Sequence, residues 1–163
     1  MGIKSLTQTI KKNSPNAIEN NNLYQLSGKK VAVDASLIIY QQLLSNRKGF
    51  FRNKEGKITN HITGLFYKII NYLSLDIELL FVFDGKPPDN KDTCIQERKD
   101  KSLKAKESMN TVTDEEEKHK LEKMSTRVTK EMIDDVKHLL NMLGVSYIHP
   151  EEGEGEAYAS ELC

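Results

Sequence analysis

The stretch Leu79-Leu80-Phe81-Val82-Phe83-Asp84 decides the fold of this chain. Its apolar residues follow one another without alternating with polar ones, which is typical of a strand that is buried on both faces of a parallel sheet. Two similar short runs occur elsewhere, Lys30-Val31-Ala32-Val33-Asp34 and Val145-Ser146-Tyr147-Ile148. These three runs predict three strands of one mostly parallel sheet.

Helices are predicted between these strands. Residues 36–44 continue directly from the first strand, and Ser36 is available as their N-terminal cap. Apolar residues recur every three or four positions across residues 60–74, which predicts a second helix with one buried face. Because strands and helices alternate, the predicted fold is an α/β three-layer sandwich with a mostly parallel central sheet.

The remaining segments are more polar. A stripe of apolar residues from Leu121 to Leu143 predicts one long helix, which starts near Thr113 and ends at Gly144. Residues 87–113 are rich in lysine and lack an apolar stripe, so we expect poorly buried helical pieces that are mobile without a partner. Residues 47–59 are expected to form a polar loop.

Length and charge narrow the class of protein. A chain of 163 residues suits one domain, and it contains no run near the roughly 18 apolar residues that span a bilayer, so no membrane partner is expected. Its net charge of zero combines a basic part, residues 1–106 with 18 Lys and Arg against 10 Asp and Glu, and an acidic part, residues 107–163 with 6 against 14. This asymmetry suggests a polyanionic partner beside a cation-binding centre, although two solvated surfaces would give the same pattern.

Carboxylates follow all three predicted strands. Asp34 ends the first strand, Asp84 ends the second, and Glu154 and Glu156 lie in the acidic loop after the third. Ligands gather at the carboxyl ends of the strands in an open parallel sheet, so these side chains are expected to share one pocket. Taken alone, each aspartate would also suit a helix cap or a turn, and each glutamate a solvated loop.

Oxygen ligands of this kind indicate a hard cation. Clustered carboxylates repel one another unless a cation is present, and an oxygen-only set suits Mg²⁺ or Mn²⁺. Two such ions about 4 Å apart can activate a water and stabilise the leaving oxygen of a phosphodiester. We therefore infer phosphodiester hydrolysis. His149 adjoins the acidic loop, but an oxygen-only site does not require it.

Residues that could hold a nucleic acid flank the expected pocket. Tyr40 and Arg47 are seven positions apart and would share a helix face, where the tyrosine could stack on a base and the arginine contact a phosphate. Lys91 and Arg98 have the same spacing after the second strand and could reach the scissile phosphate. The alternative is a core tyrosine with ordinary surface cations.

Further cations extend this basic region. Lysines at positions 99, 101, 104 and 106 continue the segment after Arg98, unless they serve only solubility. Arg127 and Lys130 lie on the predicted long helix and could contact the DNA backbone.

Several of these segments together resemble the flap endonucleases. They are Met1-Gly2-Ile3-Lys4-Ser5-Leu6, Val31-Ala32-Val33-Asp34-Ala35-Ser36 with Tyr40-Gln41, Val82-Phe83-Asp84-Gly85-Lys86-Pro87-Pro88, Val128-Thr129-Lys130, Lys137-His138-Leu139-Leu140, and the Glu-x-Glu-Ala segment at 154–157. The resemblance covers nearly the whole chain and implies a PIN-like 5′-nuclease fold. The chain would then be the N-terminal nuclease domain, residues 1–163, of such an enzyme.

The resemblance implies a role for each matching residue. Asp34, Asp84, Glu154 and Glu156 match metal-site carboxylates that bind two Mg²⁺ ions in the family, with Mn²⁺ as an alternative. Gly155 stands in the spacer, where the family often has alanine.

The DNA contacts carry over in the same way. Tyr40 matches the residue that stacks beside the cleaved phosphodiester, and Gly2 matches an N-terminus that folds close to the active site. Lys91 and Arg98 match the basic pair that holds the scissile phosphate. Residues from about 89 to 125 match the helical gateway and cap through which a 5′ flap passes.

The chain also departs from the family pattern. Flap endonucleases continue with more strands, three further metal-site aspartates, a helical DNA-binding motif and often a sliding-clamp motif. This sequence contains none of these, so the resemblance implies no clamp binding through this chain. A second chain that supplies the missing half is one explanation, and a truncated product or an incomplete gene model are others.

Three hypotheses of function follow. The first is a structure-specific 5′ flap endonuclease or 5′–3′ exonuclease that acts on flapped or branched DNA in replication and repair. The second is a non-catalytic DNA-binding fragment of such an enzyme, and the third is a small single-domain nuclease that cleaves RNA. Two cysteines without metal or redox spacing favour a reducing intracellular location, which would be the nucleus in a eukaryote.

Overall fold

The computed structural model describes residues 5–18, 22–46, 49–86, 92–109, 111–151, 153 and 155–161, without the side chains of residues 92–95, 97–99 and 156. Its elements in chain order are α1 (Leu6–Asn13), the 3₁₀ helices η1 (Pro15–Ala17) and η2 (Leu23–Leu26), β1 (Lys30–Asp34), α2 (Ala35–Leu44), α3 (Asn60–Ser74), β2 (Glu78–Val82), α4 (Asp92–Met109), α5 (Glu115–Ser125), α6 (Lys130–Met142), β3 (Ser146–Ile148) and α7 (Gly155–Glu161).

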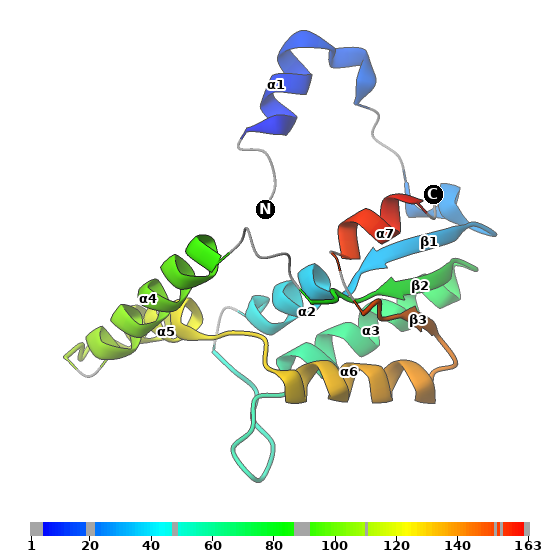
Figure 1. Cartoon of the computed structure of the whole chain (residues 1–163). Helices are drawn as coiled ribbons and strands as arrows, with labels where there is room; N and C mark the ends of the chain where they lie inside the picture. Colours follow the sequence, from blue (N-terminus) through cyan, green and yellow to red (C-terminus); the bar gives the residue numbers. More distant parts are fainter. Residues whose placement is uncertain are drawn as a thin grey trace.

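A parallel three-stranded sheet forms the centre of the fold, in the order β1-β2-β3. Asp34 at the end of β1 lies opposite Val82 of β2, and Val82 lies opposite Ile148 of β3, so all three strands end at one edge. Helices α3 and α6 cover one face of the sheet and α7 lies on the other (Figure 1). The structure thus confirms the predicted three-layer α/β fold.

The hydrophobic core lies between the sheet and the helices α2, α3 and α6. Its buried members are Ala35, Ile38, Ile39, Leu65, Ile69, Ile77, Leu79, Phe81, Phe83, Val136, Leu140 and Val145. Both faces of β2 contribute buried side chains, because Leu79 and Phe81 point one way and Val82 the other. This explains why the β2 run is continuously apolar.

The start of α2 differs from the expected one. The helix begins at Ala35, and its cap is Asp34 rather than Ser36, because Oδ1 of Asp34 accepts a hydrogen bond from the backbone N–H of Leu37 at 2.9 Å. Asp34 is also the last residue of β1, so α2 follows β1 without a connecting loop. As a result, the carboxylate of Asp34 is fixed at the carboxyl end of β1.

The predicted long helix is two helices. The chain leaves α5 at Ser125, is extended at Thr126 and Thr129, and re-enters a helix at Lys130. Thr129 caps α6, since its hydroxyl accepts a hydrogen bond from the backbone N–H of Met132 at 3.2 Å. The cap of α5 is Asp114 rather than Thr113, through a bond from the backbone N–H of Glu117.

Helices α4 and α5 form an arm that lies beyond the carboxyl ends of the strands (Figure 1). They pack through Ser102 and Ala105, which lie one turn apart on α4 and are both buried. The hydroxyl of Ser102 donates to the backbone carbonyl of Ser125 at 2.9 Å. Residues 92–109 are therefore one helix with a packed face, although the sequence shows no apolar stripe there.

The segment 49–59 folds into a short hairpin, with Arg52 and Ile58 paired antiparallel. Arg52 forms an ion pair with Glu122 of α5 at 2.7 Å, and Lys57 forms one with Glu131 of α6. The hairpin therefore contacts both the arm, through α5, and the helical layer on the sheet, through α6.

The N-terminal helix α1 stands apart from the sheet and the helices that cover it (Figure 1), and none of its residues is buried. Among the described residues, no helix combines the length and the apolar character that crossing a lipid bilayer requires.

Candidate metal and nucleic-acid site

Two of the predicted metal-site residues lie at the ends of neighbouring strands. Asp34 is the last residue of β1 and is partly buried, whereas Asp84 comes two residues after the end of β2 and is exposed. Because β1 and β2 are parallel and in register from Lys30 to Asp34, both carboxylates emerge at the same edge of the sheet. The shared edge agrees with the sequence analysis for these two residues, and a pocket that also includes Glu154 and Glu156 stays a prediction.

The carboxylate of Asp84 accepts a hydrogen bond from α7, the helix on the other face of the sheet from α3 and α6 (Figure 1). Its Oδ1 accepts a hydrogen bond from the backbone N–H of Gly155, the first residue of α7, at 2.8 Å. Each of the two aspartates thus uses one carboxylate oxygen to accept a backbone N–H, Asp34 from α2 and Asp84 from α7. The second oxygen of each carboxylate is not needed for these bonds.

Gly155 permits this contact because it has no side chain. A Cβ placed there would lie 3.1 Å from the backbone oxygen of Val82 and 3.2 Å from Oδ1 of Asp84, closer than ordinary van der Waals contact. Gly155 is buried, so α7 begins directly against the end of β2. An alanine at this position, as the family often has, would require these neighbours to shift by a few tenths of an ångström.

The chain after Asp84 pairs with the loop after β3. The backbone N–H of Gly85 donates to the carbonyl of Gly153 at 2.9 Å, and the backbone N–H of Lys86 donates to that of Glu151 at 3.1 Å. A return bond runs from Gly153 N–H to the carbonyl of Lys86 at 3.2 Å. The predicted acidic loop therefore lies beside Asp84.

His149 also contacts Asp84, which the sequence did not indicate. Its Nε2 lies 3.0 Å from the backbone oxygen of Asp84, and its Nδ1 lies 2.7 Å from the ammonium of Lys137 on α6. The same ammonium lies 5.1 Å from the centre of the Phe83 ring, which contacts the imidazole at 5.9 Å. The two residues are 12 positions apart, with a helix end and a strand between them, so no spacing rule would have paired them.

The structure describes only some of the other predicted site residues. Gly2, Arg47, Lys91 and Glu154 lie outside the described residues, and the side chains of Arg98 in α4 and Glu156 in α7 lie outside them as well. Tyr40 is on α2 with 45% of its surface exposed, so it is not a core tyrosine.

Arg127 and Lys130 do not share a helix. Arg127 lies in the extended link before α6 and is partly buried, and Lys130 is the exposed first residue of α6. The predicted common helix for them is therefore wrong, although both lie near the start of α6.

Within the part of the chain that is described, no group of three or more histidine, cysteine or acidic side chains is close enough to hold a metal ion. The pair Asp34 and Asp84 is what the described residues contribute. Its chemistry fits a hard cation, since both side chains are carboxylates and a cation would offset their repulsion.

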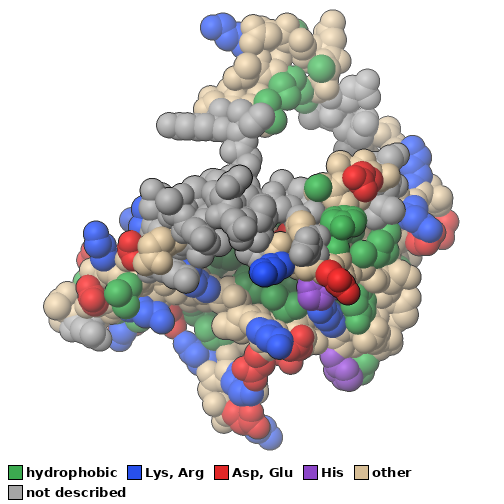
Figure 2. Space-filling view, viewed as in Figure 1, with side chains coloured by type: hydrophobic (Ala, Val, Ile, Leu, Met, Phe, Trp, Pro, Cys, Tyr) green, Lys and Arg blue, Asp and Glu red, His purple; other side chains and the backbone are tan. Residues whose placement is uncertain are grey.

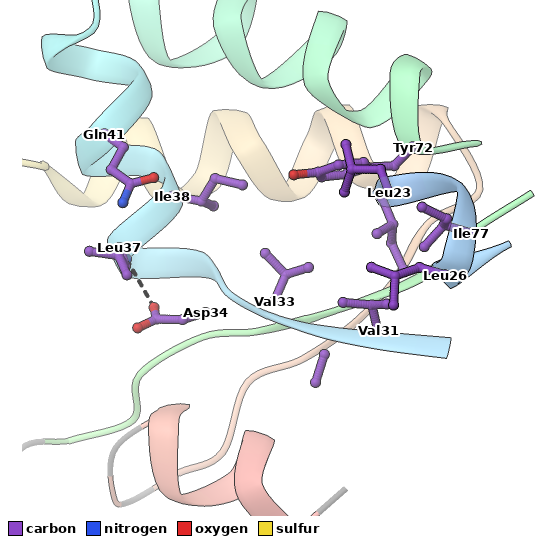
Figure 3. Close-up of a pocket in the computed structure, with 12 residues that line it drawn as sticks. Leu23, Leu26, Val31, Val33, Asp34, Leu37, Ile38, Gln41, Tyr72 and Ile77 are labelled. Carbon is purple, nitrogen blue, oxygen red and sulfur yellow. Dashed lines mark hydrogen bonds between the residues drawn. The ribbon is translucent and has the colours of Figure 1, made fainter. Parts of the chain in front are cut away.

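An apolar pocket of about 270 Å³ adjoins this edge between β1, α2, α3 and η2 (Figure 3). Asp34 lies at one end of it, and most of the other lining residues, such as Val33 and Tyr72, are apolar. This lining does not suit a cation or a phosphate. The candidate site is therefore the strand-end region outside the pocket.

Charged side chains of both signs cover the arm of α4 and α5 (Figure 2). Lys101, Lys104 and Lys106 are exposed along α4, whereas the first turn of α5 carries Glu115, Glu116 and Glu117. The exposed lysines are available for a polyanion.

Comparisons with known proteins agree with this geometry. The family model of the XPG N-terminal domain matches residues 1–105. Flap endonuclease 1 of Meyerozyma guilliermondii is 38% identical over 169 residues, which cover 100% of this chain and 45% of that protein. Flap endonuclease 1 of Homo sapiens is 36% identical over 165 residues, which cover 98% of this chain and 43% of that protein.

Solved structures give the same result. The catalytic core of Rad2 in complex with DNA substrate matches with a TM-score of 0.65 and 31% identity, over 99% of this chain and 41% of that one. Flap endonuclease-1 from Methanococcus jannaschii matches with a TM-score of 0.62 and 34% identity, over 88% of this chain and 47% of that one. The chain spans less than half the length of each of these proteins.

Proposed function

Because the chain belongs to the family of the XPG N-terminal domain, we propose that it is the N-terminal part of a structure-specific 5′ nuclease, which hydrolyses DNA phosphodiesters at flaps or branched junctions with the help of Mg²⁺. The observation that carries this proposal is the pair Asp34 and Asp84, fixed at the ends of adjacent parallel strands. Replication and repair are the processes that produce such DNA.

The metal would be held by carboxylates of this chain. Asp34 and Asp84 would bind through the oxygens that do not accept backbone N–H groups, together with Glu154 and Glu156 of the Glu-x-Glu-Ala segment. Bound Mg²⁺, two ions in the complete site, would supply positive charge at the scissile phosphate and lower the pKa of an attacking water. Mn²⁺ has the same ligand preference and would serve as a probe.

Other residues of the chain would hold the DNA. Tyr40 is exposed on α2, the helix that Asp34 caps, so its ring would be available to stack on a base. Lys91 and Arg98 would neutralise charge on the scissile phosphate, and the arm of α4 and α5 would surround the flap. The remaining proposed DNA contacts are those of Gly2, Arg47, Arg127 and Lys130.

The chain alone supplies part of such a site. It covers 45% or less of the flap endonuclease 1 relatives reported above, so the proposed activity belongs to a protein that also contains the remaining portion. A second chain would be one source of that portion. An intracellular location follows from DNA as substrate, and it would be the nucleus in a eukaryote.

A second candidate function is DNA binding without cleavage. It is favoured by the exposed Lys101, Lys104 and Lys106 of α4, which need no metal to bind a phosphate backbone. In that case the exposed lysines of α4 would still bind branched DNA, and the affinity would fall steeply with salt.

Cleavage of a labelled double-flap DNA tests these proposals. The purified chain is compared with and without Mg²⁺, and with the variants Asp84→Ala and Asp134→Ala, the latter an exposed aspartate of α6. Metal-dependent cutting that is lost only in Asp84→Ala supports the nuclease. Flap binding without cutting at any Mg²⁺ concentration, also when the remaining portion is supplied as a second chain, supports the DNA-binding fragment. Stronger cutting of single-stranded RNA would point to an RNA-cleaving nuclease instead.

A further inference from the structure

His149 and Lys137 form a chain of contacts that ends at Asp84. Lys137 projects from α6, whose neighbouring residue Val136 is fully buried in the core. His149 follows β3 directly. Lys137 therefore comes from a packed helix and His149 from the residue next to a strand, and His149 contacts the backbone oxygen of Asp84 rather than its carboxylate.

The contacts indicate which tautomer the neutral imidazole adopts. A lysine ammonium has donors only, so Nδ1 of His149 must accept the hydrogen bond from Lys137. The neutral ring then carries its proton on Nε2, which donates to the backbone oxygen of Asp84 at 3.0 Å. The ring of Phe83 lies beside the imidazole at a tilt of 57°, and the Lys137 ammonium lies over the Phe83 ring.

We propose that His149 and Lys137 are positioning residues for Asp84. His149 holds the main chain of Asp84, and this orients the carboxylate so that Oδ1 receives the N–H of Gly155 and Oδ2 remains available to a cation. The inference rests on the proposed function in assigning a metal to Asp84. Groups that fix a ligand in this way commonly change metal affinity by about 10–100-fold when removed.

One experiment that tests this proposal needs no metal. Nuclear magnetic resonance at pH 7.5 reports the tautomer of His149 and the hydrogen exchange of the Gly155 amide. We expect the Nε2–H tautomer, and an exchange rate at Gly155 that rises about tenfold in His149→Phe, as expected for loss of about one hydrogen bond. The amide of Val82 in β2 should keep its protection, which excludes general unfolding.

Conservative variants separate the hydrogen bonds from the ring. His149→Gln supplies an acceptor for Lys137 and a donor for Asp84, so it should restore most of the protection that His149→Phe loses. Lys137→Met keeps an unbranched aliphatic side chain but removes the ammonium that lies over the Phe83 ring. His138→Phe, at an exposed position of α6, is the matched control and should change nothing.

A second experiment measures Mn²⁺ affinity by electron paramagnetic resonance. His149→Phe and Lys137→Met should each raise the Kd about tenfold, whereas His138→Phe should not. The metal assignment fails if the wild-type chain does not bind Mn²⁺, or if Asp84→Asn does not weaken binding. In that case the hydrogen-exchange experiment still decides whether His149 positions Asp84. Unchanged exchange at Gly155 in His149→Phe, or no protection in the wild type, would overturn the inference.

Discussion

The break between α5 and α6 gives a prediction that tests the structure directly. Thr129→Ala removes the hydroxyl that accepts the N–H of Met132 at 3.2 Å. The residue is exposed, so water can replace part of the lost bond, and the expected loss is about 1 kcal/mol of the free energy of unfolding, in the middle of the range for such caps. For a domain of this size, that loss lowers Tm by roughly 2–4 °C.

Chemical denaturation followed by circular dichroism is the assay. Thr129→Ser keeps the hydroxyl oxygen and should remain close to the wild type. Thr113→Ala removes the residue that the sequence suggested as a helix start, and it should also have little effect because Asp114 provides the cap. The m-value should not change, since the surface exposed on unfolding is the same.

The result that would refute this reasoning is a lack of difference between the two substitutions at position 129. Equal destabilisation by alanine and serine would mean that the hydroxyl is not a cap. No destabilisation by either, with undiminished helical signal, would mean that α5 and α6 are one continuous helix, as the apolar periodicity predicted.

Three further predictions concern the core, pH and DNA binding. Leu140→Ala should cost about 2–5 kcal/mol in the free energy of unfolding measured by urea denaturation, because Leu140 is fully buried, whereas Leu103→Ala at an exposed position should stay within about 0.5 kcal/mol. Burial lowers the pKa of His61 in the folded state, and the charge of Asp135 partly opposes this effect. The unfolded chain therefore binds the proton more readily than the folded chain. As a result, the free energy of unfolding decreases as pH falls from the ordinary histidine range toward the lower pKa of the folded state. Denaturation at pH 8 and pH 5 should therefore show a smaller pH dependence in His61→Phe than in the wild type, and the reverse would contradict the buried neutral form. Lys104→Gln should reduce the slope of log affinity for flap DNA against log salt by about 0.9 if it contacts one phosphate, with Lys12→Gln on α1 as the unchanged control.

The sheet and its acidic edge could be predicted because their signals are local. A continuous apolar run identifies a strand buried on both faces, and parallel strands must end at the same edge, so Asp34 and Asp84 had to lie near one another. The amphipathic period also predicted α3 with its observed bounds, 60–74. These features depend on patterns among residues that are close in the sequence.

The α5–α6 break was hidden because Val128, which packs against the core, falls in phase with the apolar stripe on both sides. The periodicity therefore continued across a segment that is extended. The Thr129 cap was present in the sequence, but a threonine within an apparent helix carries little weight against a long stripe.

The contacts of His149 could not be predicted for a different reason. They depend on where α6 places Lys137 relative to the end of β3, which is a property of tertiary packing. An oxygen-only metal site also gave no reason to consider a histidine. The role of Gly155 was equally hidden, since the close approach of α7 to Val82 appears only when the layers are assembled.

Two contacts of α6 restrict insertions and deletions within this helix. Glu131 in its first turn pairs with Lys57 of the hairpin, and Lys137 further along it contacts His149, at a separation of about 9 Å along the axis. One inserted or deleted residue between them would rotate Lys137 by about 100° and remove it from His149, while the hairpin pair stayed in place. Insertions and deletions should therefore be rejected within α6, yet tolerated at the tip of the hairpin around Gly56, which has open space beside it.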